Sequence, residues 1–190
     1  MNCKICTYLS DFLFETLILQ KYLVRYYKCR SCGFIQTENP YWLNEAYNSP
    51  IASIDVGLLQ RNISLSEQVS KILEVVDTEK SIYLDYGGGY GIFVRLMRDK
   101  GFHFYLSEIY AENLFAKHFE LQNAELKKEF TCLTTFEVFE HLVNPLEEIG
   151  KMFSLSDTII FSTELQPNDN LKDAKDWWYF VPEGGQHISF

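Results

Sequence analysis

The sequence predicts an α/β fold, in which an open and mainly parallel sheet follows a small cysteine-rich module at the N-terminus. Apolar runs typical of strands alternate with helix-type patterns from residue 63 onward. A glycine-rich turn at 85–91 follows the first of these runs, and two Cys-x-x-Cys pairs lie within the first 32 residues. Regular alternation of strands and helices favours a parallel sheet whose faces are covered by helices.

The N-terminal module contains four of the five cysteines, arranged as two close pairs: Cys3 with Cys6, and Cys29 with Cys32. Each pair supplies two thiolates from one tight turn, and the spacer brings the second turn opposite the first, as around tetrahedral zinc. Gly33 follows the second pair and suits the turn of a zinc knuckle. Four protein ligands leave the metal no open position, so we expect a structural, zinc-ribbon-like site. Two redox-active thiol pairs are the alternative.

Breaks in the pattern divide the chain into three predicted parts. A zinc-binding module covers residues 1–36, a linker with an aromatic segment covers 37–62, and an α/β domain covers 63–190. The segment Thr37-Glu38-Asn39-Pro40 sets the first limit, because its composition is typical of a loop.

The α/β domain is expected to begin with a helix, because Ser64 and Glu67 have the spacing of a capping box in front of an apolar stripe. Pro145 is typical of the first turn of a later helix. Strands are expected at residues 82–85, 102–106, 119–121, 131–135 and 158–162, and helices after the glycine turn, at 111–117 and from 145.

The turn Asp85-Tyr86-Gly87-Gly88-Gly89-Tyr90-Gly91 joins the first strand to a helix. Glycines let a ligand approach the backbone closely, because no Cβ stands in the way. The spacing Asp-x-Gly-x-Gly-x-Gly resembles motif I of the class I S-adenosylmethionine (SAM) methyltransferases. The resemblance implies a SAM site at Asp85, Gly87, Gly88, Gly89 and Gly91. A dinucleotide fingerprint is the alternative, but it requires glycine where Ile92 stands.

Further cofactor contacts are expected beyond the carboxyl ends of the strands, where ligands of open α/β sheets bind. Glu108 follows the second strand and is expected to accept hydrogen bonds from both ribose hydroxyls of the adenosine. Phe136 and Glu137 follow the fourth strand, so we expect them to face SAM and its acceptor.

The segment after the fourth strand contains side chains that suit catalysis. If it is helical, Glu137, Glu140 and His141 share one face, where they could hold a divalent cation or pair a base with its orienting acid. Glu-Val-Phe-Glu-His-Leu resembles the Glu-x-x-Glu-His metal ligands of RNA 3′-end 2′-O-methyltransferases and ubiquinone-pathway O-methyltransferases. In the former a downstream histidine, here His187, completes the site. A hydroxyl acceptor must also lose a proton, and His141 or His187 is the candidate catalytic base. The alternative is that Glu140 caps a turn and His141 satisfies backbone groups.

A cysteine module followed by motif I is also similar to the order in nucleotide-sugar C-methyltransferases. The aromatic and polar string from Trp177 to His187 suits the binding of a sugar, and equally suits core packing. We therefore expect SAM-dependent methyl transfer to a small, polyhydroxylated acceptor, a sugar or nucleotide-sugar. The alternative is a non-catalytic SAM- or nucleotide-binding protein that recruits a partner through its zinc module and aromatic tail.

Composition limits the partners of the chain. A net charge of −9 and a pI near 4.9 disfavour nucleic acid as a partner. No run of about 18 apolar residues occurs, so we expect no membrane span and a cytoplasmic location. The class I fold has more strands than the sequence predicts here. We therefore expect either a catalytic domain truncated at its C-terminus or a homo-oligomer in which a second copy covers the open sheet edge.

Overall fold

The computed structural model describes residues 1–48, 55–123, 130–167 and 171–190. The chain divides into two compact units. Unit 1 comprises Met1–Ser49, Glu137–Ile149 and Thr163–Phe190, and unit 2 comprises Pro50–Phe136 and Gly150–Ser162. The limits 1–36, 37–62 and 63–190 stay a prediction from the sequence.

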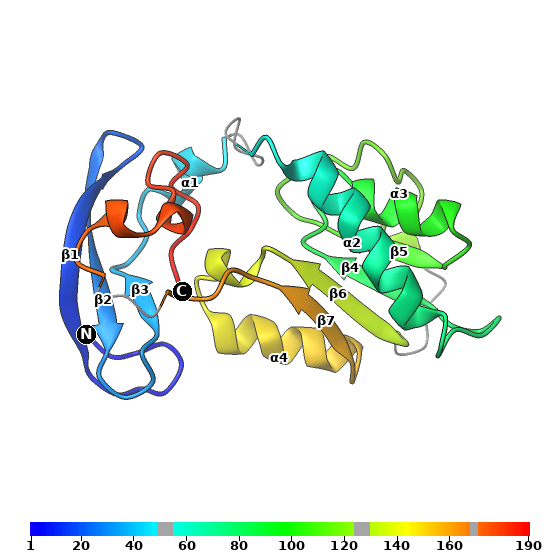
Figure 1. The fold of residues 1–190 in the computed structure, drawn as a ribbon, viewed down its shortest axis with the longest axis horizontal. Coiled ribbons are helices and arrows are strands. Elements are labelled where there is room, and N and C mark those ends of the chain that lie inside the picture. The colour runs from blue at the N-terminus through cyan, green and yellow to red at the C-terminus, as the bar shows by residue number, and fades with distance from the viewer. Residues whose placement is uncertain (49–54, 124–129, 168–170) are drawn as a thin grey trace. The chain divides into compact units, whose positions relative to one another are not determined.

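Unit 2 is built on a four-stranded parallel sheet in the order β5-β4-β6-β7, which confirms the predicted α/β class. The strands are β4 (Tyr83–Tyr86), β5 (Phe104–Ser107), β6 (Cys132–Phe136) and β7 (Ile159–Ser162). β4 pairs in parallel with β5 on one side and with β6 on the other (Figure 1). The strand order therefore reverses at β4, and in such sheets ligands bind at the carboxyl end of that strand.

Apolar side chains of two helices cover this sheet. α2 (Leu58–Leu73) and α3 (Ile92–Asp99) pack together in unit 2 (Figure 1). Helical spacing places Val69 and Leu73 of α2 in the same buried core as Phe93 and Met97 of α3. α4 (Pro145–Leu155) begins at the expected proline and connects β6 to β7.

The start of α2 differs from the prediction, because the helix already begins at Leu58. Ser64 therefore lies inside the helix, where its hydroxyl accepts a hydrogen bond from the Gln68 amide at 3.2 Å instead of capping. The first turn is stabilised by a short ion pair between Arg61 and Asp55, whose atoms Nη2 and Oδ2 are 2.6 Å apart. The helix start predicted from the capping-box pattern was wrong, because the helix begins earlier and extends through Ser64 and Glu67.

The segment between β5 and β6 also differs from the prediction. Residues 111–117 form no helix, because two amides of this segment donate instead to the carbonyl oxygen of Tyr90, both at 3.0 Å. Residues 119–121 form no strand and contribute a single parallel bridge between Leu106 and Glu120. Long-range contacts of the glycine turn override the local propensity of this segment.

Unit 1 contains an antiparallel sheet of β1 (Ser10–Ile18), β2 (Tyr22–Cys29) and β3 (Ile35–Thr37), followed by the short helix α1 (Leu43–Ala46). Residues 188–190, here called the C-terminal strand, pair with the outer side of β3. The last residues of the chain therefore extend the N-terminal sheet.

Aromatic side chains from both ends of the sequence fill the core of unit 1. Phe14 stacks on Tyr26 with ring centroids 4.7 Å apart, and Phe180 meets Phe14 edge-on at 5.1 Å. Trp177 is buried in the same core, whereas Trp178 is 71% exposed. Most of the C-terminal aromatic string therefore packs in the core, which was one of its two predicted uses.

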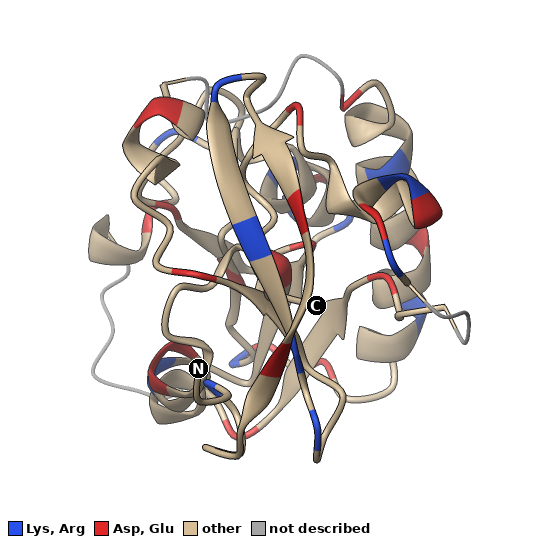
Figure 2. Ribbon diagram, turned by 90° about the vertical axis from the view of Figure 1, so that its left-hand side faces the viewer, with Lys and Arg blue, Asp and Glu red and all other residues tan. Residues whose placement is uncertain are grey.

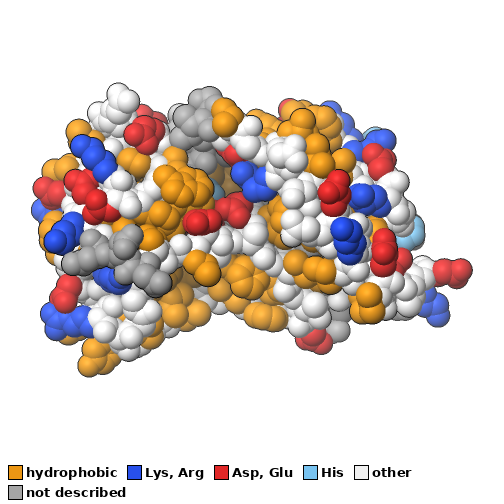
Figure 3. All heavy atoms as spheres, viewed as in Figure 1, with side chains coloured by type: hydrophobic (Ala, Val, Ile, Leu, Met, Phe, Trp, Pro, Cys, Tyr) orange, Lys and Arg blue, Asp and Glu red, His pale blue; other side chains and the backbone are white. Residues whose placement is uncertain are grey.

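The surface mixes charges of both signs. On the β1–β2 hairpin, basic and acidic residues are interspersed (Figure 2). Arg25 lies 3.6 Å from Glu15, and Arg30 forms two hydrogen bonds with Asp11. Apolar side chains are scattered among polar ones on the face shown in Figure 3. No helix in the described ranges is both long enough and apolar enough to cross a bilayer.

The aromatic core allows a direct test of the fold of unit 1. Phe180→Ala should lower the free energy of unfolding by about 3–5 kcal/mol, because it removes a fully buried ring. Trp178→Ala, two residues away and exposed, should change it by less than about 0.5 kcal/mol. Urea denaturation followed by circular dichroism measures both, and equal losses would contradict this core.

Candidate functional site

The turn after β4 has a backbone that only glycine adopts without strain. Gly87, Gly89 and Gly91 have φ angles of +72°, +55° and +81°. Side chains with a Cβ rarely occupy this left-handed region. Gly91 is also the residue from which α3 starts. The backbone conformation therefore explains why glycine stands at each of these three positions of the motif.

Asp85 is buried at the end of β4, with 2% of its surface exposed. The Thr134 hydroxyl of β6 donates a hydrogen bond to its Oδ1 at 2.7 Å. A Cβ at Gly88 would overlap the Asp85 carboxylate and lie 2.5 Å from a methyl group of Leu106, so only glycine lets the turn fold over this carboxylate. Burial raises the pKa of Asp85 to about 7, against the opposing effect of the Thr134 bond.

Glu108 lies directly after β5 and holds the glycine turn in place. Its Oε2 accepts the backbone N–H of Gly89 at 2.8 Å. Its Oε1 accepts the amides of Ile109 and Tyr110 at 2.8 and 2.7 Å, with Ala111 at 3.2 Å. Oε2 accepts only the Gly89 amide among these hydrogen bonds, so it keeps a lone pair for a hydroxyl donor. The sequence did not predict that Glu108 also fixes the turn.

Phe136 ends β6, the strand that pairs with β4. Its ring meets Phe93 of α3 edge-on, with centroids 5.0 Å apart. Phe136 is half-buried and packs against the core of unit 2.

A second group of polar side chains lies in unit 1 and is called here the Glu/His cluster: Glu137, Glu140, His141, Tyr179 and His187. The Tyr179 hydroxyl lies 2.6 Å from Glu137 Oε2 and 2.5 Å from Glu140 Oε1. Burial raises the pKa of Glu140.

The two histidines of the cluster are in contact, with ring centroids 4.8 Å apart. His141 Nδ1 lies 3.1 Å from the carbonyl oxygen of Gln186, and His187 Nδ1 lies 2.7 Å from that of Tyr179. Because a carbonyl oxygen only accepts, each Nδ1 carries the hydrogen and each Nε2 presents a lone pair. Burial lowers the pKa of both imidazoles to about 4. Both rings are therefore neutral near pH 7.

Three residues of the cluster could together hold a metal ion. Ligand atoms of Glu140, His141 and His187 all lie within 4.8 Å of one another. Glu140 is 2% exposed, and its Oε2 has no hydrogen-bond partner among the described residues. A buried carboxylate oxygen without a partner is costly, and a cation held with two imidazole nitrogens would satisfy it.

The local backbone of this segment corrects one assumption of the sequence analysis. Only Phe139–His141 is helical, as a short 3₁₀ turn, and Glu137 precedes it with φ at +54°. A positive φ at a residue with a Cβ is strained. Glu137 and Glu140 therefore do not share a helical face; they converge through Tyr179 instead.

Some site residues were missed by the sequence reasoning. Thr134 on Asp85, Tyr179 between the two glutamates, and Tyr47, whose hydroxyl lies 3.2 Å from His141 Nδ1, act through contacts across the fold. Only Tyr179 carried a local signal, since it lies in the aromatic string before His187.

The four N-terminal cysteines form a second possible metal site. Their sulfur atoms all lie within 4.8 Å of one another, with Cys3 and Cys32 3.7 Å apart and Cys6 and Cys29 3.4 Å apart. Tetrahedral zinc with Zn–S bonds of about 2.3 Å requires sulfur separations of roughly 3.8 Å. Backbone amides of Ile5 and Ser31 point at the sulfurs of Cys3 and Cys29, both at 3.4 Å. All four cysteines are free, so their arrangement is compatible with zinc.

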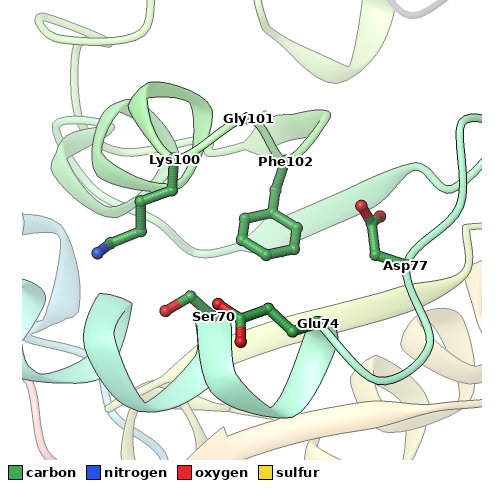
Figure 4. A pocket seen from close by; sticks show the side chains of 6 residues that line it. All are labelled: Ser70, Glu74, Asp77, Lys100, Gly101 and Phe102. Atoms are coloured by element: carbon green, nitrogen blue, oxygen red, sulfur yellow. The ribbon is translucent and has the colours of Figure 1, made fainter.

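A surface pocket of about 520 Å³ lies elsewhere in unit 2 (Figure 4). It is lined by Ser70, Glu74, Asp77, Lys100, Gly101 and Phe102. Lys100 and Gly101 follow the C-terminal end of α3, whereas the glycine turn precedes its N-terminal end. The pocket therefore lies apart from the predicted cofactor site.

Comparison with known proteins agrees with this geometry. A family model described as a methyltransferase domain matches residues 59–190. The match includes the glycine turn, Glu108 and the whole Glu/His cluster. A search of curated proteins gives no match.

The buried carboxyl of Asp85 predicts a pH dependence. Its pKa rises from 3.8 when exposed to about 7 in the fold, so its contribution to stability is full below pH 3.8 and is lost as the pH rises through 7. The melting temperature of the wild-type chain should therefore fall more between about pH 5 and about pH 8 than that of Asp85→Asn. Thermal unfolding of both proteins across this pH range measures the difference. If the melting temperatures of the two proteins fall equally with pH, the buried titration of Asp85 is contradicted.

Proposed function

The chain belongs to the class I SAM-dependent methyltransferases, and we propose that it methylates a hydroxyl group of a small, polyhydroxylated acceptor such as a sugar or nucleotide-sugar. The glycine turn folded over buried Asp85 carries the assignment of the donor site. The alternative of a non-catalytic binding protein finds no support in the family match or in the structure.

The donor side of the proposal uses residues of unit 2. The backbone of Gly87, Gly88, Gly89 and Gly91 would accommodate SAM closely, and Glu108 would bind its ribose through Oε2. SAM supplies an electrophilic methyl group. Holding donor and acceptor in line accounts for much of the acceleration in such displacements.

The acceptor side of the proposal uses the Glu/His cluster of unit 1. A hydroxyl acceptor must lose a proton on methylation, and a neutral imidazole can accept it. His141 and His187 therefore remain the candidate bases. Their low pKa makes them weak bases, however, and suits them better as ligands of a metal ion.

We therefore favour a divalent cation bound by Glu140, His141 and His187. Glu137 would not ligate it directly, but contacts Tyr179, which in turn contacts Glu140. Three observations support this cation site: the close ligand atoms, the Glu140 Oε2 that lacks a hydrogen-bond partner in the described part of the chain, and the two Nδ1–H groups that leave each Nε2 free to ligate. Metal-ligating histidines usually donate their other ring N–H in this way. A bound cation would lower the pKa of an acceptor hydroxyl.

Oligomerisation through the edge of the parallel sheet and a cytoplasmic location stay proposals that rest on the sequence alone. The zinc assignment at Cys3, Cys6, Cys29 and Cys32 is supported by the sulfur geometry.

Two substitutions should separate donor binding from turnover. Glu108→Ala should weaken SAM binding about tenfold to a hundredfold, because it removes a charged acceptor of hydrogen bonds. Glu112→Ala, a nearby exposed residue, should leave SAM affinity unchanged and serves as its control. His141→Ala should leave SAM affinity within about twofold yet lower turnover by at least about a hundredfold.

Calorimetry measures SAM affinity, and release of S-adenosylhomocysteine over a panel of sugars and nucleotide-sugars measures turnover. Equal losses of both quantities in His141→Ala would contradict its assignment to the acceptor side. Wild-type SAM binding without product on any acceptor would contradict the proposed acceptor class.

Tyr179 should orient the cation ligands. Tyr179→Phe should weaken Mn²⁺ binding about tenfold to a hundredfold, because it frees the Glu140 carboxylate from its fixed position. Tyr83→Phe is the matched control, since Tyr83 is also buried and donates to a carboxylate, Asp77, at 2.7 Å in unit 2. Electron paramagnetic resonance measures free Mn²⁺. Equal Mn²⁺ affinity of the two variants would contradict the proposal that Tyr179 orients the cation ligands.

A further inference from the structure

The zinc-binding cysteines and the Glu/His cluster belong to the same compact unit, and Gln36 connects them. The Gln36 side chain is fully buried. Its Oε1 accepts the backbone N–H of Lys4 at 2.8 Å, and its Nε2 donates to the carbonyl oxygen of Asn2 at 2.9 Å. Asn2 and Lys4 flank Cys3, so this one amide group fixes the backbone on both sides of a zinc ligand.

The backbone of Gln36 pairs with the C-terminal strand. Gln36 forms an antiparallel bridge with Ser189. On one side of this bridge, Ile35 and Phe190 exchange two backbone hydrogen bonds of 2.8 Å, and on the other the N–H of Thr37 donates to Ile188 at 2.9 Å. β3 therefore holds each residue of the C-terminal strand in register.

The C-terminal strand in turn holds the Glu/His cluster. The amides of Ile188 and Ser189 both donate to the backbone carbonyl oxygen of Glu140, at 2.8 and 3.1 Å. The Ser189 hydroxyl donates to the carbonyl oxygen of Phe139 at 3.1 Å. His187 immediately precedes the strand. The positions of one carboxylate and one imidazole of the cluster are thus set by this strand.

A second connection leads from the other cysteine pair to the same strand. Gly33, in the turn after Cys32, offers its carbonyl oxygen to Nε2 of Gln166 at 3.2 Å. The same nitrogen donates to the carbonyl oxygen of Phe190 at 2.9 Å. Both cysteine turns are therefore joined to the C-terminal strand through a buried or half-buried glutamine.

We propose that the zinc module positions the acceptor site: the four-cysteine site keeps Gln36 in place, and Gln36, as a positioning residue, keeps the C-terminal strand against Glu140 and His187. This inference rests on the proposed function of the Glu/His cluster. Zinc removal then lowers cation binding and methyl transfer while the donor site of unit 2 stays intact.

The first experiment removes zinc from the full chain with a mercurial reagent and a chelator, and monitors its release with a colorimetric dye. Hydrogen exchange of the peptide containing residues 186–190 should then lose protection, and Mn²⁺ affinity should fall at least about tenfold. SAM affinity should stay within about twofold. Retained protection and retained Mn²⁺ affinity in the zinc-free chain would overturn the inference.

The second experiment keeps all four cysteines and uses Gln36→Leu, which preserves the volume but removes the two side-chain hydrogen bonds. With zinc bound, it should reproduce the faster exchange at 186–190 and the weaker Mn²⁺ binding, and zinc removal should add little further loss. Arg30→Ala is the control, since Arg30 adjoins Cys29 and its exposed side chain forms an ion pair with Asp11. Wild-type behaviour of zinc-loaded Gln36→Leu would overturn the role of Gln36. If zinc removal unfolds the whole wild-type chain, so that SAM binding is lost, zinc-loaded Gln36→Leu still tests the inference, because it keeps its zinc.

The exchange measurement separates this inference from the proposed function. If the wild-type chain binds no Mn²⁺ and methylates no acceptor, the proposed cation site falls. Loss of protection at 186–190 on zinc removal would still support the link between the module and the strand, and unchanged protection would refute it.

Discussion

Each compact unit of this chain buries a carboxyl group, and the need to satisfy that group orders the segments around it. In unit 2, Asp85 is held by the Thr134 hydroxyl and covered by Gly88, so the turn can follow only a narrow path. In unit 1, Glu140 is held by Tyr179 through its side chain and by the C-terminal strand through its backbone. A buried polar group without partners costs up to several kcal/mol, which makes these contacts strong constraints on the fold.

The limits of the family match and of the compact units do not coincide. The match begins at residue 59, after all four cysteines of the N-terminal module. Yet the sheet that carries these cysteines is extended by residues 188–190, which lie inside the match. The cysteine module is therefore not an independent appendage in the structure. Its core is shared with the C-terminal aromatic residues, including Phe180.

The polar groups of the two units differ in their chemistry. Unit 2 presents backbone and one carboxylate around a glycine turn, which suits a nucleoside with an amino-acid tail. Unit 1 presents carboxylates and neutral imidazoles, because burial lowers the pKa of His141 and His187 to about 4. Neutral imidazoles beside a buried carboxylate are groups that can ligate a divalent cation, since metal ligands must be deprotonated.

The sequence by itself determined the α/β class, the glycine turn that follows Asp85, and the two Cys-x-x-Cys pairs that come together as one possible metal site. Each of these depends on residue types at fixed short spacings. The tertiary structure alone decided that residues 111–117 form no helix and that Glu137 has a left-handed backbone. The resemblance had already implied that His187 joins Glu140 and His141, but only the tertiary structure brought Tyr179 to Glu140, 39 positions earlier in the chain. Such contacts depend on packing across the whole unit, and no local pattern of apolar or polar residues encodes them.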